Sequence, residues 1–316
     1  MNGPAKSLAV VGLLALLISL PYVAPLFGIY IGLVTRIIIL GLGAVALNFL
    51  IGFTGVVSFG HAAFFGLGAY GTAMVLKYFV PSTPLAIILG VLLGTLTAVL
   101  VGALIQQLRG IYFAVVTIAF GQIFYYIAMQ WHTVTGGDDG LTNWSGSPIG
   151  IGSMKLHIFN DEVALYYFVL VIFIISVAII SLLLKSPFGR ILLAIRENEL
   201  RSSFLGVSVN RYIWVSFVIS GLFMSVAGSL YALLNNFADP HTLHWTMSGD
   251  FVMMIILGGI RSLWGPLLGA LLFVGLQDII SSYTEHWMFV IGIIFMIIVL
   301  YFPRGILGSL SLRLKK

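Results

Sequence analysis

The residues best suited to bind or move a solute lie between positions 52 and 61. The stretch Gly52-Phe53-Thr54-Gly55-Val56-Val57-Ser58-Phe59-Gly60-His61 combines hydroxyls, an imidazole and glycines between two apolar runs. Where water is scarce, such a break must face protein or a water-filled path, and its freed backbone groups can hold a polar or zwitterionic solute. Two interpretations stay open. One is a packed hairpin with glycine turns, and the other is a solute path formed by Thr54, Gly55, Ser58, Gly60 and His61.

Other motifs argue against an enzyme. The sequence has no GxxxxGK[ST], HExxH or GxSxG string, and it has no cysteine, so we predict no ATPase site of its own, no cofactor and no metal. Gly66-Leu67-Gly68-Ala69-Tyr70-Gly71 matches a dinucleotide-binding string, but no acidic residue follows within about 20 residues to hold a ribose. We interpret this string, and the Gly-x-x-x-Gly pairs at 90–94 and 265–269, as sites of close helix packing. A second glycine-rich break, at 257–266, resembles the first too weakly to establish a repeat.

Residues 185–211 form a basic connection with the pattern of an amphipathic helix. Ser186-Pro187 is a sound helix start, Gly206 fits a C-terminal stop, and Glu197 and Arg201 have the favourable spacing of an ion pair. One face would carry Leu193, Leu200 and Phe204. The pattern alone leaves two roles open: a helix that rests on the inner leaflet, or a helix that docks a cytoplasmic partner.

The composition determines the class of fold. Of the 316 residues, 60% are apolar and 8% are charged, against about 25% charged in an average soluble domain. This excludes a water-soluble fold and a disordered or nucleic-acid-binding chain, and the continuous apolar runs exclude an outer-membrane barrel. We predict an all-α, polytopic integral membrane protein, with residues 1–316 as a single transmembrane domain with glycine-rich helix breaks.

We predict about ten spans, since a spanning helix needs about 20 residues. Lys6 before an apolar stretch is typical of a signal peptide, but the apolar run continues past Pro21, too far for a typical signal core. The predicted segments are 7–27, 29–51, 57–80, 84–107, 110–131, 161–184, 212–236, 243–260, 263–281 and 286–303.

The charges predict the orientation of these spans. With a cytoplasmic N-terminus and ten spans, 12 of the 15 basic residues lie inside, which is the positive-inside pattern. Both termini and the 185–211 segment are then cytoplasmic, and the polar loop 132–160 is periplasmic. The exceptions are Arg36, Lys77 and Lys155.

Several strings together resemble a known family. They include the run 47–70, Leu108-Arg109-Gly110-Ile111-Tyr112-Phe113-Ala114, Gly189-Arg190 with Ala194-Ile195-Arg196-Glu197-Asn198-Glu199, and the run 302–308. In combination they resemble the longer permease subunit of bacterial branched-chain amino acid ABC transporters, over roughly residues 35–308. Urea and amide permeases share much of this pattern.

The resemblance implies a location in the bacterial inner membrane, a heterodimer with a second permease, two cytoplasmic ATP-binding subunits and a periplasmic solute-binding protein. It also implies that the helix of residues 189–206 couples to the ATP-binding subunits, although the Glu-Ala-Ala string of better-known importers is absent. The residues of this expected coupling site are Gly189, Arg190, Arg196, Glu197, Asn198, Arg201 and Gly206. The alternatives are a urea or amide permease and an ion-coupled secondary transporter. The second is disfavoured because no carboxylate network is evident within the spans.

Overall fold

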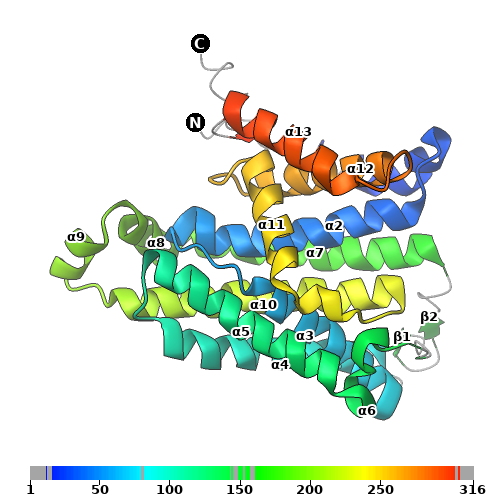
Figure 1. Ribbon diagram of the computed structural model, residues 1–316, viewed down its shortest axis with the longest axis horizontal. Coiled ribbons are helices and arrows are strands. Elements are labelled where there is room, and N and C mark those ends of the chain that lie inside the picture. The colour runs from blue at the N-terminus through cyan, green and yellow to red at the C-terminus, as the bar shows by residue number, and fades with distance from the viewer. Residues whose placement is uncertain are drawn as a thin grey trace.

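The structure is a computed structural model whose elements are almost all helical (Figure 1). It describes residues 12, 16–79, 82–142, 144, 149–151, 154–156, 161–302 and 305–306. The chain termini and part of the 302–308 motif therefore lie outside the described residues. The principal helices are α2 (Ile31–Asn48), α3 (His61–Met74), α4 (Thr83–Ile105), α5 (Gly110–Gln130), α7 (Glu162–Lys185), α8 (Pro187–Glu197), α9 (Glu199–Phe204), α10 (Val209–Asn235), α11 (Trp245–Gly258), α12 (Gly265–Ser281) and α13 (Trp287–Tyr301).

Short elements complete the connections. A π-helical turn, Phe49–Thr54, continues α2, and a second one, Val75–Phe79, continues α3. The loop after α5 holds the single helical turn α6 (His132–Thr135) and an antiparallel hairpin of β1 (Ile149–Ile151) and β2 (Met154–Leu156). A 3-10 turn, Pro240–Leu243, precedes α11.

Five described helical segments are long and apolar enough to cross a membrane. They are Ile31–Thr54, Thr83–Ile105, Gly110–Gln130, Glu162–Lys185 and Val209–Asn235. The other predicted segments also contain helix, but as shorter apolar pieces, which include Leu16–Phe27, α11, α12 and α13. The polytopic all-α class is confirmed, while the number ten stays a prediction.

Most long helices run along the long axis of one bundle. Figure 1 shows α4 and α5 at one edge, α12 and α13 at the other, and α2, α7 and α10 between them. The most extensive packing joins α3 to α10 and α4, while α2 is buried almost along its whole length by α7, α10 and α12. Burial on all sides is expected for a helix that is apolar all round, so α2 is the central helix of the bundle.

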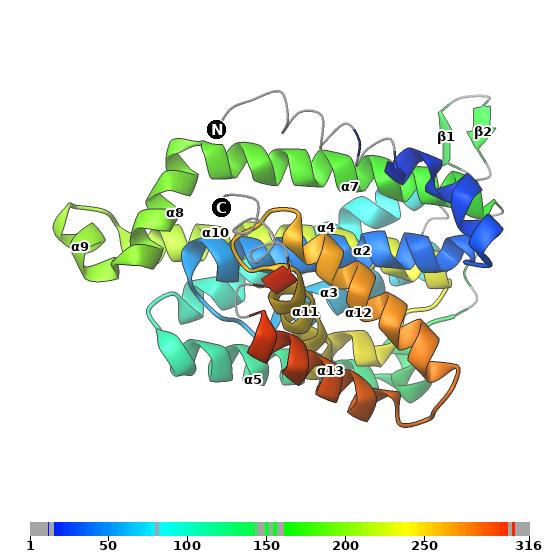
Figure 2. The ribbon, with the colours of Figure 1, turned by 90° about the horizontal axis from the view of Figure 1, so that it is seen from above.

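The two long connections lie at opposite ends of this bundle. Helices α8 and α9 extend beyond one end, and α6, β1 and β2 lie at the other (Figures 1 and 2). We refer to these as the α8/α9 end and the β1/β2 end. The separation agrees with the predicted placement of the 185–211 segment and the 132–160 loop on opposite sides of a membrane.

The glycine strings mediate close helix contacts, as predicted. A Cβ atom at Gly68 would lie against the Ser225 carbonyl of α10, and one at Gly71 would lie 2.7 Å from the Cα of Gly90 on α4. At Gly269, a Cβ would meet the Met254 carbonyl of α11. Removing side chains lets backbones approach, which is how apolar helices associate without a hydrophobic driving force.

Replacement of Gly68 by alanine should therefore destabilise the protein. The new methyl group would push α3 away from α10, and overpacking of this kind costs about 1–3 kcal/mol. Gly292→Ala on α13 is the matched control, because a Cβ there meets no atom within 4 Å. Thermal unfolding in detergent micelles should show a lower midpoint for Gly68→Ala and an unchanged midpoint for the control. Equal midpoints would contradict this account of the α3–α10 contact.

Candidate functional site

The predicted glycine-rich break is present between α2 and α3. The π-helical turn ends at Gly55, which has a φ of +83°, and residues 55–60 then run without regular structure back into the bundle. Helix α3 begins only at His61. The left-handed conformation at position 55 is one that residues with a side chain rarely adopt. The helix start therefore lies inside the protein, where its backbone groups need partners.

His61 connects the break to α10. Its Nδ1 lies 2.8 Å from Ser58 Oγ, and its Nε2 lies 2.9 Å from Ser220 Oγ. The Ser220 hydroxyl donates to the Ala46 carbonyl at 2.6 Å, so its oxygen must accept from the histidine. These bonds place a hydrogen on Nε2, and in the neutral ring Ser58 then donates to Nδ1. Both ring nitrogens are thus occupied.

Aromatic rings enclose the same histidine. The rings of Phe64 and Phe217 meet His61 edge-on, with centroids 5.3 and 5.1 Å away. Ser58 and His61 have no exposed surface. Within this chain, the two residues therefore stabilise the break and do not face open solvent.

Two further hydroxyls hold the backbone of the break. The amide of Phe59 donates to Thr117 Oγ1 of α5 at 3.2 Å, and the amide of Ala62 donates to Ser248 Oγ of α11 at 2.8 Å. A Cβ at Gly60 would collide with the Thr117 carbonyl. Only a glycine therefore allows the chain to approach α5 so closely.

The remaining predicted path residues differ in exposure. Thr54 is buried, and its hydroxyl has no hydrogen-bond partner among the described residues. Gly55 is exposed, as is its near neighbour Val57. The structure thus places all five predicted residues in one segment, with its accessible face at Gly55 and Val57.

The second glycine-rich break packs against the first. The Asn48 side chain donates to the Ser262 carbonyl at 2.9 Å, and a Cβ at Gly52 would meet the Ile260 carbonyl. The sequence analysis identified both breaks but did not bring them together. Their contact joins the end of α2 to the α11–α12 connection.

The coupling segment begins as predicted but is not one helix. Ser186 caps α8 by accepting from the Gly189 amide at 3.5 Å, with Pro187 as the first helical residue. The expectation of a continuous helix over 189–206 is wrong, because α8 ends at Glu197. Asn198 has an extended backbone, and its side chain caps the next helix, α9, by accepting from the Arg201 amide at 2.8 Å. Asparagine often starts helices in this way.

The break changes which side chains face the bundle. Leu192 and Ile195 are buried, whereas the predicted apolar face is exposed: Leu193 by 40%, Leu200 by 71% and Phe204 by 87%. Leu205 is 79% exposed. Helix α9 therefore ends in an apolar tip, which we define as Leu200, Phe204 and Leu205.

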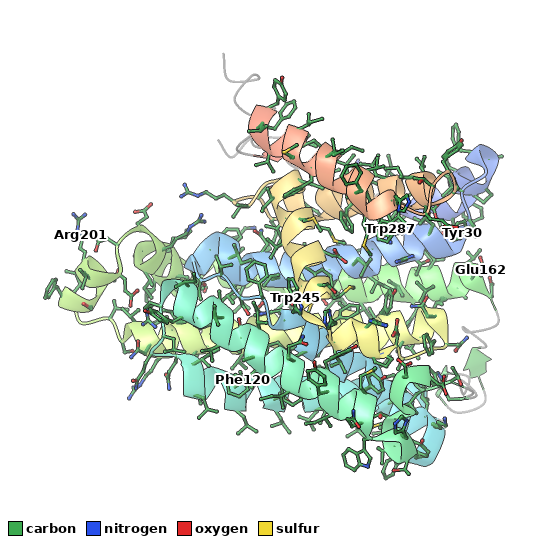
Figure 3. The ribbon with its side chains drawn as sticks, viewed as in Figure 1. Tyr30, Phe120, Glu162, Arg201, Trp245 and Trp287 are labelled. Atoms are coloured by element: carbon green, nitrogen blue, oxygen red, sulfur yellow. The ribbon has the colours of Figure 1, made fainter. Side chains whose placement is uncertain are left out.

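The other predicted coupling residues have varied surroundings. Gly189 packs against the Leu184 carbonyl, and Gly206 has a φ of +83° after α9, which confirms the predicted stop. The charged side chains of Arg190, Glu197 and Arg201 are exposed. Figure 3 shows Arg201 on α9, at the α8/α9 end of the bundle.

Arg196 connects the coupling segment with the break. A Cβ at Gly55 would lie 2.9 Å from its Cγ atom, so the aliphatic stem of Arg196 lies directly on the glycine. Burial, together with the nearby Arg261, lowers the pKa of the Arg196 guanidinium. Two sites that the sequence analysis treated as separate are therefore in contact.

Arg109 makes the only ion pair among the described residues, and it was not among the predicted coupling residues. Its Nε donates to Glu199 Oε1 of α9 at 2.6 Å, and its Nη1 donates to the Gln106 carbonyl at 2.6 Å. Glu199 therefore pairs with Arg109, and the predicted Glu197–Arg201 pair does not form. Arg109 also donates to Asn210 at the start of α10. A cavity of about 470 Å³ lies beside Glu199, the ion-pair partner of Arg109, between α9 and the adjoining ends of α4 and α10.

Sequence reasoning missed the hydroxyls that hold the break. A signal was available for Ser220, because α10 carries serines at 216, 220, 225 and 229, all of them buried. Serines repeated on one apolar helix indicate hydrogen bonds across helices. Nothing local marks Thr117 or Ser248, since their partners lie far away in the sequence.

Comparisons with known proteins find relatives over almost the whole chain. Over 98% of its length, the chain is 28% identical to the high-affinity branched-chain amino acid transport system permease protein LivM of Escherichia coli (strain K12), of which it covers 77%. It is 24% identical to the probable branched-chain amino acid transport permease protein LivM of Methanocaldococcus jannaschii, over 84% of this chain and 89% of that protein.

A shorter match involves a differently named permease protein. The chain is 29% identical to the permease protein LivH of Salmonella typhimurium, over 44% of this chain and 46% of that protein. No solved structure matches the chain significantly. The sequence profile of the family described as "Branched-chain amino acid transport system / permease component" matches residues 29–299. The chain therefore belongs to this family of membrane-embedded permease components.

Proposed function

We propose that this chain is the permease subunit of an ATP-driven importer that moves a branched-chain amino acid into the cytoplasm. The observation that carries the proposal is the family match over residues 29–299. It agrees with a sequence that lacks a phosphate-binding loop, since such a subunit must obtain its energy from partner chains.

The assembly that we propose has four kinds of component. This chain pairs with a second permease, as supported by its similarity to both LivM and LivH proteins. Two ATP-binding subunits bind at the α8/α9 end, and a periplasmic solute-binding protein delivers the solute at the β1/β2 end. The bundle lies in the bacterial inner membrane with both chain termini in the cytoplasm, which the sorting of basic residues supports.

The apolar tip of α9 is the docking element for an ATP-binding subunit. Helix α9 extends beyond the bundle at its more basic end (Figure 1). Its Leu200 and Phe204, and Leu205 directly after it, are exposed, and exposed apolar side chains that gather in this way indicate a protein contact. The charged residues Glu197 and Arg201 precede or belong to the same helix, and with Arg190 of α8 they offer exposed polar side chains on the coupling segment.

Two connections lead from the docking element to the break. In the first, α8 carries Arg196, which lies on Gly55. In the second, Arg109 joins α9 to the start of α5 through Glu199, and Thr117 of α5 binds the Phe59 amide. A movement of the coupling segment therefore acts on both sides of residues 55–60, along whose exposed face the solute passes.

Removal of the apolar tip should detach the ATP-binding subunits. We expect the double variant Leu200→Ser with Phe204→Ser to lose both their co-purification and ATP-dependent leucine uptake into proteoliposomes. Insertion and pairing with the second permease should persist, because the side chains of the tip are mostly exposed. Tyr283→Ser, which removes an 86% exposed aromatic side chain at the other end, is the control.

One result would contradict the docking role of α9, and two others would contradict the proposed energy source or solute. Normal association and uptake in the double variant would make α9 an element of the membrane surface. Uptake by the parent complex that needs an ion gradient and no ATP would favour the ion-coupled alternative. If the parent complex and its binding protein prefer urea or short amides, the solute assigned here is wrong and the chain is a urea or amide permease.

The path is tested at Val57, which is 40% exposed on the accessible face of the break. We expect Val57→Trp to lower the maximal rate of ATP-dependent uptake, because the indole would narrow the route, while the complex still assembles. Ile111→Trp, at an exposed site near the start of α5, controls for added bulk. Unchanged uptake in Val57→Trp would contradict the solute path and favour the interpretation of the break as a packed hairpin.

A further inference from the structure

The cavity at the α8/α9 end has a polar lining. Its volume is about 470 Å³, and α9, the C-terminal end of α4 and the start of α10 enclose it. Apart from Leu200 and Val209, the residues that line it are polar or charged. A chain with so few polar residues thus gathers several of them around one space, where the bundle ends.

The cavity presents free hydrogen-bond donors and a positive charge. Among the described residues, the side chains of Gln107, Ser208 and Arg211 make no hydrogen bond and no ion pair. The one acid of the lining, Glu199, is already bound by Arg109 at 2.6 Å. The charge that remains without a counter-ion is therefore that of Arg211, which favours an anion as the occupant.

An exposed apolar strip on α4 leads to this cavity. Leu96, Leu100 and Leu104 follow one another at a spacing of four residues, so they lie along one side of the helix. All three side chains are more than half exposed. Gln107 of the cavity lining follows Leu104 by three residues and continues this side. Figure 1 shows α4 at an edge of the bundle, where an apolar strip faces the acyl chains of a membrane.

Helix α10 adjoins the same strip. The Trp214 Nε1 donates to the Val99 carbonyl of α4 at 3.1 Å, and a Cβ at Gly102 would lie 2.9 Å from the Trp214 ring. Val215, one turn after Arg211, is exposed. Tryptophan is enriched at the level where the apolar core of a membrane meets its head groups. The polar cavity therefore lies directly beyond an apolar surface that two packed helices form.

We propose that this cavity binds the phosphate group of an anionic phospholipid, whose acyl chains lie on the apolar strip of α4. The phosphodiester accepts from the Arg211 guanidinium, for which its planar donors are suited, and Gln107 and Ser208 supply further donors. Basic pockets between membrane helices at the cytoplasmic side suit such head groups. The assignment rests on the proposed function only in placing the α8/α9 end at the cytoplasmic face of the membrane.

The two parts of the site together favour a lipid over other anions. A free phosphate ion would satisfy Arg211 but would leave the adjoining strip without a role. An acidic segment of an ATP-binding subunit would likewise use the charge alone. A zwitterionic lipid carries the same phosphate, but its ammonium group offsets the charge that Arg211 attracts. A lipid bound in this way would connect α9 with α4 and α10, beside the Arg109–Glu199 pair.

The test uses the absence of native cysteine in this chain. Ser203→Cys places a single thiol in the wall of the cavity, in the assembled transporter after removal of its lipid in maltoside micelles. We expect dioleoyl phosphatidylglycerol to slow modification of this thiol by an uncharged, water-soluble methanethiosulfonate, followed by the mass of this chain. Dioleoyl phosphatidylcholine at the same mole fraction should have little effect. Leu193→Cys, exposed on α8 outside the cavity, should react equally with either lipid.

A charge variant tests the named arginine. In the Ser203→Cys background, Arg211→Gln should raise the fraction of phosphatidylglycerol needed for half-protection about five-fold, the usual contribution of one basic side chain to binding an anionic lipid. Lys185→Gln is the matched control, because it removes an exposed positive charge at the same end of the bundle but outside the cavity. The basal reactivity of the thiol and the co-purification of the partner chains should not change in either variant.

Four outcomes would overturn the lipid site. Equal protection by phosphatidylcholine, or equal effects of Arg211→Gln and Lys185→Gln, would mean that no head group is recognised. Equal protection by inorganic phosphate or glycerol 3-phosphate would identify a free phosphate compound as the ligand. A thiol that is protected without lipid, and becomes reactive when the ATP-binding subunits are removed, would assign the cavity to a protein interface. Because the assay needs neither ATP nor transport, a failure of ATP-driven uptake would count against the proposed function alone.

Discussion

The structure depends on one constraint: a chain that breaks its helix inside an apolar bundle must find hydrogen-bond partners for the groups it frees. Residues 55–60 and the start of α3 have this problem. Hydroxyls from α5 and α11 accept from two of the freed amides, while a hydroxyl of α10 fixes the histidine at the helix start. Thr117 binds the Phe59 amide, Ser248 binds the Ala62 amide, and Ser220 binds His61. The positions of α5, α10 and α11 around α3 follow from these bonds and from the glycines that let the backbones approach.

The break and the end of α2 contact two separate connections of the chain. On one side Gly55 contacts the stem of Arg196, and on the other Asn48 binds the carbonyl of Ser262. The first contact leads to α8, and the second leads to the connection between α11 and α12. A segment held by so many directional bonds has discrete arrangements and is not continuously deformable. This property suits an element that must respond to a distant partner.

Local patterns in the sequence predicted the local features correctly. The apolar runs gave the helices, Ser186-Pro187 gave the start of α8, and the glycine string around Gly68 gave a packing surface. Features that depend on residues distant in the sequence were not predicted. The charge of Glu199 pairs with Arg109, 90 positions away, and Asn198 ends one helix and caps another, although asparagine is also tolerated within helices. The distant partner of His61, Ser220, could be suspected only from the serines repeated along α10, because the sequence around His61 carries no sign of it.

The partners of the break also have a consequence for biosynthesis. Phe59 is separated from Thr117 by 58 positions, His61 from Ser220 by 159, and Ala62 from Ser248 by 186. A ribosome releases the chain in order, at about 5–20 residues per second, so α2 and α3 emerge long before Ser248 exists. During this interval the unpaired amides must find other hydrogen-bond partners, either in the insertion machinery or in water that enters the membrane with the chain. Truncation before Ser248 would thus leave the Ala62 amide of the nascent chain without its hydrogen-bond acceptor, and a quality-control protease would meet that defect far from the truncation itself.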